Sequence, residues 1–193
     1  MVNHIFGDKV LNYYKIVAVI VAVALSVSLI LNLYFYLYVR VQNENVTNNM
    51  RARALASYGG QMGTIKYLFN KYLDTKNRSL IGNEAMWCAY GAELMVDACR
   101  QGSDEEIYNQ LWKTAHAVRM FGLDVREAPI TNETKISLAI SSLDHISHYF
   151  AGFEMLRDVD PIKHLSQVYG ANATATVIYY CEILQDNLSS LLE

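Results

Sequence analysis

The 24 residues from 16 to 39 contain no charged side chain, and this segment constrains the chain more than any other feature of its sequence. At about 1.5 Å per residue it would form a helix of roughly 36 Å, enough to cross a hydrocarbon core of about 30 Å with some tilt. Aromatic residues flank it, as expected where a span meets two headgroup layers: Tyr13, Tyr14, Tyr34, Phe35, Tyr36 and Tyr38. The sequence therefore predicts one transmembrane helix.

A cleaved signal peptide is the alternative interpretation of this N-terminal segment. Its apolar stretch is much longer than the usual h-region of about 7–15 residues, and no small-residue cleavage site follows it. A lipoprotein anchor is disfavoured because no cysteine lies near the segment. We therefore expect an uncleaved anchor, with a short tail at 1–15, the span at 16–39 and a polar linker at 40–49 that is poor in helix formers.

The remaining residues, 50–193, are enough for one domain with a buried core. They contain two prolines and no run with the alternation of a strand, whereas apolar residues recur at alternating steps of three and four. This pattern predicts five helices, at about 47–74, 80–100, 103–122, 131–157 and 160–192. The expected fold class is all-α: a transmembrane helix followed by an antiparallel bundle of about five helices.

Capping residues set the expected ends of these helices. Ser103 and Glu106 form a capping box, Thr131 is expected to cap the fourth helix, and Asp160 begins the fifth with a proline after it. Gly102 and Gly122 are expected to end the second and third helices. The second helix carries two apolar stripes, so we expect it to be central and buried. One stripe is Ile81, Ala85, Cys88, Ala92, Met95 and Cys99, and the other is Trp87, Gly91, Leu94 and Ala98.

Three glycines in the first predicted helix of the domain, Gly59, Gly60 and Gly63, need an explanation. A glycine in a helix interior costs about 1 kcal/mol relative to alanine, so some contact must gain from a close backbone approach. One interpretation is tight helix packing. The other is an apolar cavity that these glycines line together with Ala85 and Ala92 of the second helix. A phosphate-binding loop is excluded, because no strand precedes the glycines and no Lys-Ser/Thr pair follows.

Five N-x-Ser/Thr sequons follow the span, although 14 Asn and 20 Ser or Thr residues in 193 would give only one or two by chance. Three lie in expected linkers or loops and are candidate N-glycosylation sites: Asn45, Asn77 and Asn132. Asn172 and Asn187 lie within a helical pattern. Helix and turn capping is the alternative role for all five.

The sequons also supply the orientation of the span, because the flanking positive charges are level. Lys9, Lys15 and the amino terminus precede the span, and Arg40, Arg51 and Arg53 follow it. We therefore expect a single-pass protein of the cell membrane whose C-terminal domain is extracytoplasmic.

No residue cluster in the sequence predicts catalysis, a metal or a cofactor. His145 and His148 are three residues apart, but a helical wheel places both on the solvated face of the fourth predicted helix. No Glu-x-x-His pair of a di-metal bundle and no nucleophile motif occurs. We therefore expect a protein that is not an enzyme.

The three cysteines allow two interpretations. Cys88 and Cys99 lie about 16 Å apart along one predicted helix, so they cannot bridge each other, although either could bridge Cys181. The simpler interpretation is three buried thiols without a bond.

The expected function is that of a non-catalytic accessory or scaffold subunit that acts through protein contacts, with a partner protein or as a homo-oligomer. Tyr and Met residues at helical spacing are usually part of a core; the alternative is that the surplus Tyr forms a partner surface, for which Tyr179 with Tyr180 is the expected patch. The net charge of −3 provides no basic field for nucleic acid. The alternative is a ligand-binding or sensing module with an apolar cavity that signals through a partner.

Overall fold

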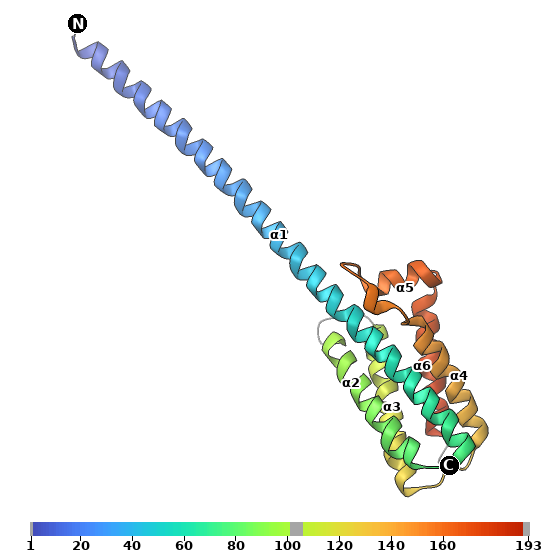
Figure 1. Cartoon of the computed structure of the whole chain (residues 1–193). Helices are drawn as coiled ribbons and strands as arrows, with labels where there is room; N and C mark the ends of the chain where they lie inside the picture. Colours follow the sequence, from blue (N-terminus) through green and yellow to red (C-terminus); the bar gives the residue numbers. More distant parts are fainter. Residues whose placement is uncertain (1, 101–105, 191–193) are drawn as a thin grey trace. The chain divides into compact units, whose positions relative to one another are not determined.

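The computed structural model describes residues 2–100 and 106–190, and it gives side chains from Lys15 onward. The chain divides into two compact units, residues 1–45 and 46–193, which are described separately below. Both are helical, and no strand occurs in the described residues. Helix α1, Val2–Thr75, belongs to both units (Figure 1).

The first unit is the N-terminal part of α1. Every side chain from Lys15 to Glu44 is exposed in it, including the whole apolar segment. By length and composition, α1 is the described helix that is apolar enough to cross a membrane. The apolar side chains of this segment are not used to build a protein core.

The second unit, which we call the head, is a helical bundle. It comprises the part of α1 from Val46 and then, in chain order, η1 (Leu80–Ala85, π-helical), α2 (Met86–Arg100), α3 (Glu106–Glu127), α4 (Glu133–Tyr149), η2 (Phe153–Met155, a 3-10 turn), α5 (Pro161–Tyr169) and α6 (Ala173–Ser189). Helix α3 packs against α2 and α6, and α6 packs against α4. Helix α1 contacts α3 through Phe69 and Phe121, and it contacts the end of α4 at Gly59.

The apolar seams expected from the sequence form the core of the head. The seam of α1 is at most 5% exposed: Leu55, Tyr58, Met62, Ile65, Phe69 and Tyr72. The fourth predicted helix contributes a second buried seam: Ile136, Ala139, Leu143, Ile146, Phe150 and Phe153. Burying one large apolar side chain contributes about 1.5–3 kcal/mol, so these seams dominate the stability of the bundle.

The first helix of the head does not begin at Thr47, because α1 is already helical through residues 40–49. Extending an existing helix costs far less than starting one, so a few poor helix formers do not interrupt it. Asn49 in this segment also forms hydrogen bonds within the head. Asn49 Nδ2 donates to Asp158 Oδ1 at 2.9 Å, and the Asp158 backbone N–H donates to Asn49 Oδ1 at 2.9 Å.

The end expected for the third helix at Gly122 is wrong, since α3 continues to Glu127. A Cβ atom on Gly122 would lie 2.8 Å from Met86 Cβ and 3.1 Å from the Ile81 carbonyl oxygen. This glycine therefore allows α3 to approach the junction of η1 and α2. The capping box at Ser103 and the helix end at Gly102 lie outside the described residues.

The fourth and fifth predicted helices are each shorter than expected. Asn132, rather than Thr131, caps α4 by accepting a hydrogen bond from the Lys135 backbone N–H at 3.3 Å. The helix ends at Tyr149, and Gly152 then adopts a φ of +82°. Gly170, with a φ of +94°, divides the expected 160–192 helix into α5 and α6. Positive φ is a conformation that glycine adopts without steric cost, and it cannot continue an α-helix.

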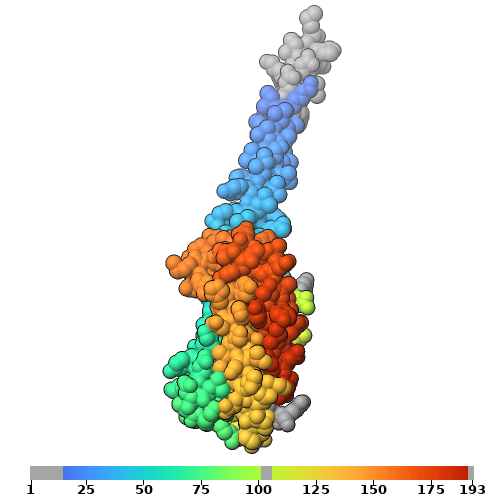
Figure 2. All heavy atoms as spheres, turned by 90° about the vertical axis from the view of Figure 1, so that its right-hand side faces the viewer, coloured from blue at the N-terminus to red at the C-terminus, as the bar shows by residue number. Residues whose placement is uncertain are grey.

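The expected start at Asp160 is confirmed. The Asp160 carboxylate accepts hydrogen bonds from the backbone N–H groups of Ile162 at 2.9 Å and Lys163 at 3.3 Å. Figure 2 shows the segment from about residue 150 to 170, in orange to red, covering one end of the head.

Candidate functional site

A buried carboxylate joins α2 to α3. Glu93 is 8% exposed, and its Oε2 atom lies 2.7 Å from Arg119 Nε on α3. The two atoms form an ion pair by distance, although they are not aligned for a hydrogen bond. Glu93 Oε1 lies 3.2 Å from His116 Nδ1, which is also 3.1 Å from Arg119 Nη2. Nδ1 accepts from Arg119 when unprotonated and donates to Glu93 when protonated.

Aromatic rings extend this contact along the same pair of helices. The His116 ring stacks on Trp112 with centroids 5.1 Å apart, and the Arg100 guanidinium lies 4.5 Å from the Trp112 ring centroid. The Arg119 guanidinium lies 5.8 Å from the Tyr90 ring centroid, and Tyr90 contacts Trp87 edge to face at 5.9 Å. We call this set the α2–α3 row: Trp87, Tyr90, Glu93, Asp97, Arg100, Trp112, His116 and Arg119.

The row follows from helical spacing. Its members on α2 recur at steps of three, three, four and three, and those on α3 at steps of four and three, so each set lies along one side of its helix. Asp97 Oδ1 accepts a hydrogen bond from Arg100 Nη2 at 2.8 Å within α2. The row therefore fixes the register of α2 against α3 through alternating charged and aromatic groups.

A surface groove of about 350 Å³ lies beside the row, lined by Met86, Trp87, Tyr90, Arg119 and Leu123. Its lining is mostly apolar, and its polar groups are the Tyr90 hydroxyl and the Arg119 guanidinium, which also contacts Glu93 and His116. The groove can therefore accept an apolar side chain next to a positively charged group.

The outer apolar stripe of α2, expected to be buried, is exposed. Trp87 is 63% exposed and Leu94 is 53% exposed. Of the other predicted stripe, Ile81, Ala85, Ala92 and Cys99 are buried, whereas Cys88 is half-buried and Met95 is 45% exposed. We call the exposed set Trp87, Tyr90, Leu94 and Met95 the α2 face. An exposed apolar surface of this kind typically marks a contact with another molecule.

The three glycines of α1 have different surroundings. A Cβ on Gly59 would lie 2.8 Å from Phe150 Cβ and 3.4 Å from the Ser147 carbonyl oxygen, whereas one on Gly60 would meet no atom within 4 Å. A Cβ on Gly63 would lie 3.8 Å from Ser147 Cβ, an ordinary van der Waals contact. Gly59 and Gly63 thus face α4, while the buried residues Ala85 and Ala92 belong to η1 and α2. The structure does not bring these five residues together around one of the grooves described here.

Of the two tyrosines of the expected partner surface on α6, one is exposed and the other packs against α4. Tyr179 is 57% exposed, whereas Tyr180 stacks on His145 of α4 with centroids 4.1 Å apart. Tyr180 therefore holds α6 against α4. His145 and His148 are exposed, as expected from the wheel. Among the described residues no three His, Cys, Asp or Glu side chains gather so that they could hold a metal ion.

The candidate glycosylation sites differ in setting. Asn77 and Asn132 are exposed near helix ends, and Asn77 Oδ1 accepts a hydrogen bond from the Ser79 backbone N–H at 3.1 Å. Asn45 is half-buried within α1 rather than in an irregular linker. Modification at all three positions stays a prediction.

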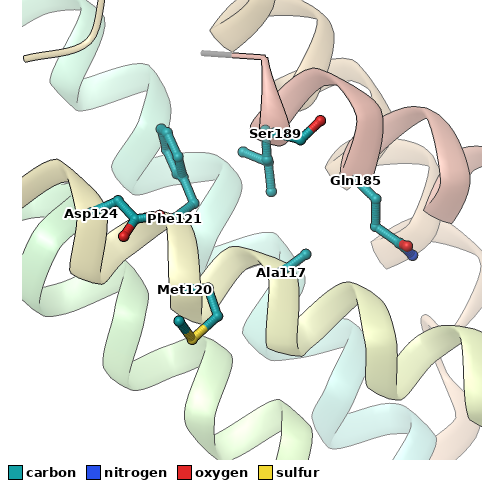
Figure 3. Close-up of a pocket in the computed structure, with 7 residues that line it drawn as sticks. Ala117, Met120, Phe121, Asp124, Gln185 and Ser189 are labelled. Carbon is teal, nitrogen blue, oxygen red and sulfur yellow. The ribbon is translucent and has the colours of Figure 1, made fainter. Parts of the chain in front are cut away.

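Two further grooves are structural. One of about 190 Å³ lies between α3 and α6 (Figure 3), where the labelled side chains are Ala117, Met120, Phe121, Asp124, Gln185 and Ser189. The other, of about 320 Å³, contains Arg78 and Arg126. Arg78 donates to the carbonyl oxygens of Val125 and Ala128, and Arg126 donates to that of Gly82 at 2.6 Å. Both guanidiniums thus bond backbone carbonyls near helix ends.

The three cysteines are free thiols, of which Cys99 and Cys181 are buried and Cys88 is half-buried. Burial raises the pKa of Cys181 to about 12, although a hydrogen bond with Thr114 opposes the shift. Burial also raises the pKa of Tyr58 well above its ordinary value, and the Tyr58 hydroxyl donates to the Leu111 carbonyl oxygen at 3.0 Å. Both groups are neutral parts of the core.

These shifts predict alkaline instability of the head. A group whose pKa is raised by folding stabilises fully below its unfolded pKa, near 9 for a thiol, and loses that contribution as pH rises toward the folded pKa. For Cys181 the loss reaches about 2 kcal/mol by pH 10.5. Urea unfolding of the full chain in mild detergent at pH 8 to 10.5 measures it. Cys181→Ala should flatten the pH dependence more than Cys88→Ala, and equal slopes in both variants would contradict the assignment.

Sequence reasoning missed the α2–α3 row, although its signal is present. Glu93 falls on the inner side of α2, where a carboxylate needs a partner, and His116 and Arg119 lie three residues apart on the next helix. The row offers charge and aromatic surface for recognition. Comparison with known proteins adds no assignment, because no protein family, no curated protein and no solved structure matches the chain.

Proposed function

We propose that this chain is a single-pass membrane protein whose head acts as a non-catalytic accessory or scaffold subunit and binds its partner through the α2 face. The observation that carries the proposal is the exposure of Trp87 and Leu94 on a helix whose other side is buried. The apolar segment of α1 supports the membrane anchor by its length and composition. The five sequons after the span favour an extracytoplasmic head.

The composition of the α2 face favours a protein partner. Tyr, Trp, Met and Arg are enriched at the centres of interfaces, and Trp, Tyr and Arg dominate the residues whose loss weakens binding most. Trp87, Tyr90 and Arg119 lie side by side here. Contacts to Glu93 and His116 restrict the Arg119 side chain, so its ordering costs less when a partner binds.

The alternation of small and large residues along α2 favours a helix as the partner's contacting element. Gly91 and Ala98 alternate with Trp87 and Leu94 along one stripe, of which Trp87, Leu94 and Ala98 are exposed. Small residues between large ones allow the ridge of a second helix to approach closely. A second copy of this chain can supply such a helix as well as another protein.

Site-specific crosslinking in native membranes tests the proposal. A photoreactive phenylalanine analogue at Leu94 or Trp87 should form a discrete protein adduct, whereas the same analogue at Tyr67 of α1, which is 61% exposed, should not. The double variant Trp87→Ala, Leu94→Ala should lower the yield of the complex at least tenfold. It should leave the head folded, because both side chains are mostly exposed.

Two results would contradict this function. Purification of the wild-type chain in mild detergent as a monomer that forms no adduct at Leu94 would remove the partner. Equal adduct yields at Leu94 and Tyr67 would remove the α2 face as its site. A tagged and an untagged copy expressed together distinguish a homo-oligomer from another partner.

A second candidate function is a ligand-binding or sensing module that signals through a partner. The groove beside Trp87 and Tyr90 favours it, because its volume of about 350 Å³ reaches the lower end of the range of ligand pockets. Solvent extraction of the purified protein followed by mass spectrometry should then release one apolar small molecule per chain. The variant Leu123→Trp, which fills the groove, should lose that molecule; extraction of none would remove this candidate.

A further inference from the structure

The end of the head at which α1 enters has a loop fastened to it. Asp158 adopts a φ of +55°, and its backbone N–H and carboxylate bond the side-chain amide of Asn49 at 2.9 Å each. The Phe153 ring packs edge to face against Phe150 and His164, which fixes the start of this loop to α4 and α5. Residues 153–160 are therefore held at one place on the bundle.

Apolar side chains project from this fastened loop and its neighbours into solvent. Met155 is 78% exposed, Met50 is 66% exposed, Val168 is 56% exposed and Val159 is 37% exposed. They come from η2, α1, α5 and the loop between η2 and α5. We call these four residues the entry-end patch. Exposed apolar groups on a loop that is held in place favour a contact with another molecule, because their burial removes apolar surface from water.

Some charged side chains beside the patch are exposed, and others form hydrogen bonds within the head. Arg157 and Lys163 are exposed. Of the nearby acids, Asp158 bonds Asn49 and Asp160 caps α5, so both carboxylates are engaged within the head. Glu154 is exposed. The surroundings of the patch therefore contain two exposed cationic side chains and three carboxylates, of which Asp158 and Asp160 bond groups of the head. Arg157 and Lys163 can reach lipid phosphates while their stems cover apolar surface.

Chain length determines which end of the head stays near a membrane that holds the 16–39 segment. Val39 and Asn49 are ten residues apart, so even a fully extended chain keeps Asn49 within about 36 Å of the end of the span. Within the head, α1 continues for 26 residues from Asn49 to Thr75, which adds about 39 Å. Of these two ends of the bundle, the entry end is the one tethered beside the bilayer.

We propose that the entry-end patch rests on the headgroup layer of the membrane that anchors the chain. This inference rests on the proposed membrane anchor. Met155, Val159 and Val168 enter the boundary between headgroups and acyl chains, and Arg157 and Lys163 contact phosphates. The area involved is small, and one or two shallow apolar contacts would be too weak to recruit a soluble protein. The covalent span supplies the high local concentration that makes them sufficient.

A contact of this kind would set the orientation of the head. With the entry end on lipid, the α2 face lies along the side of the bundle and remains accessible to a partner in the same membrane. The two surfaces share no residue, so one can be disrupted without the other.

Fluorophore quenching in lipid nanodiscs tests the contact with the full chain. An environment-sensitive fluorophore is attached at Met155→Cys in a Cys88→Ala background, where the two other native thiols, Cys99 and Cys181, are buried. Phosphatidylcholine with a nitroxide on its headgroup is the quencher. We expect at least twofold stronger quenching at Met155→Cys than at Leu138→Cys. Leu138 is a matched control, since it is 51% exposed on α4 near Glu133, which pairs with Lys76 at the opposite end of the head.

A second variant and a reference label keep the outcomes distinct. Val159→Glu with Val168→Glu should lower the quenching at position 155 to the value of the Leu138→Cys control.

A label at Ser28→Cys, in the middle of the predicted span, reports insertion through quenching by nitroxides on the acyl chains. If the label at Ser28→Cys is quenched but the label at position 155 is quenched no more than the one at Leu138→Cys, the proposed lipid contact is wrong and the proposed anchor is retained. If the label at Ser28→Cys is not quenched, the proposed anchor itself is wrong. A label at 155 that is shielded from water without lipid quenching would show a protein or a second copy on the patch and overturn the lipid contact.

Discussion

Replacing Gly59 with alanine is expected to lower the free energy of unfolding of the head by about 2–3 kcal/mol, whereas the same change at Gly60 should raise it by about 0.5–1 kcal/mol. The two residues are neighbours on α1 with the same intrinsic helix propensity. Their surroundings differ: a Cβ on Gly59 would lie 2.8 Å from Phe150 Cβ, and one on Gly60 would meet nothing within 4 Å. The new methyl group at 59 must therefore push α1 away from the end of α4.

The strain at Gly59 is hard to relieve locally. Phe150 is 1% exposed and packs against Tyr58 and Phe153, so its Cβ cannot shift without moving other core rings. The Ser147 carbonyl oxygen, at 3.4 Å from the same added atom, blocks the other direction. At Gly60 the alanine only restricts the unfolded chain and improves helix propensity.

Urea unfolding of the full chain in mild detergent, followed by circular dichroism, measures both changes. Gly63→Ala is an intermediate control, because its added Cβ would make an ordinary contact of 3.8 Å with Ser147 Cβ. If Gly59→Ala and Gly60→Ala changed stability by the same amount and sign, the tight crossing of α1 and α4 would be refuted. An apolar cavity beside Gly59 would also predict a neutral or stabilising Gly59→Ala.

The same residue type in two positions shows why helix ends were harder to predict than the core. The sequence pattern predicts a helix end at Gly122 and an unbroken helix through Gly170, and both predictions are wrong. In the structure Gly122 stays helical and admits Met86, whereas Gly170 turns to a φ of +94° and separates α5 from α6. What distinguishes them is the element that lies opposite, and one sequence does not contain that information. The buried seam from Leu55 to Tyr72 was predictable because its spacing is local.

The sequence shows the residues of the candidate site, but it does not show which of them are exposed or paired. The stripe through Trp87 and Leu94 is visible on a helical wheel, but the wheel does not say how many neighbours a helix has. Helix α3 lies on one flank of α2 and Gln61 of α1 lies beside Gly91, and the rest of this stripe, Trp87, Leu94 and Ala98, is exposed. Pairing Glu93 with Arg119 likewise needs the register between α2 and α3, which is fixed by packing and not by spacing within either helix.

Replacing Glu93 with leucine is expected to lower the free energy of unfolding by about 3 kcal/mol. The change removes the acid that lies 2.7 Å from Arg119 Nε and 3.2 Å from His116 Nδ1. Breaking a buried ion pair from one side typically costs about 3–5 kcal/mol, and the 28% exposure of the Arg119 side chain lowers that range through solvent screening. Most of the loss comes from the guanidinium that is left without its counter-charge against the Tyr90 ring.

This origin of the loss predicts a partial recovery when both charges are removed. Arg119→Met keeps the length of the side chain, so the double variant Glu93→Leu, Arg119→Met should be more stable than Glu93→Leu alone by at least about 1 kcal/mol. Urea unfolding followed by tryptophan fluorescence is suited to the measurement, because Trp112 stacks on His116 within the row. The exposed pair of Lys76 and Glu133 is the control, and Glu133→Leu should cost less than about 1 kcal/mol.

Additive losses in the double variant would show that Glu93 and Arg119 do not stabilise each other, and the α2–α3 row would then be a set of independent contacts. A coupled result would instead identify the row as the element that holds α2 in place while its outer face stays free for a partner. Under that result Glu93→Leu should also weaken the complex that we propose to form through Trp87 and Leu94, although the Glu93 side chain is only 8% exposed. The double variant should recover part of the binding together with the stability, because both depend on the same register between α2 and α3.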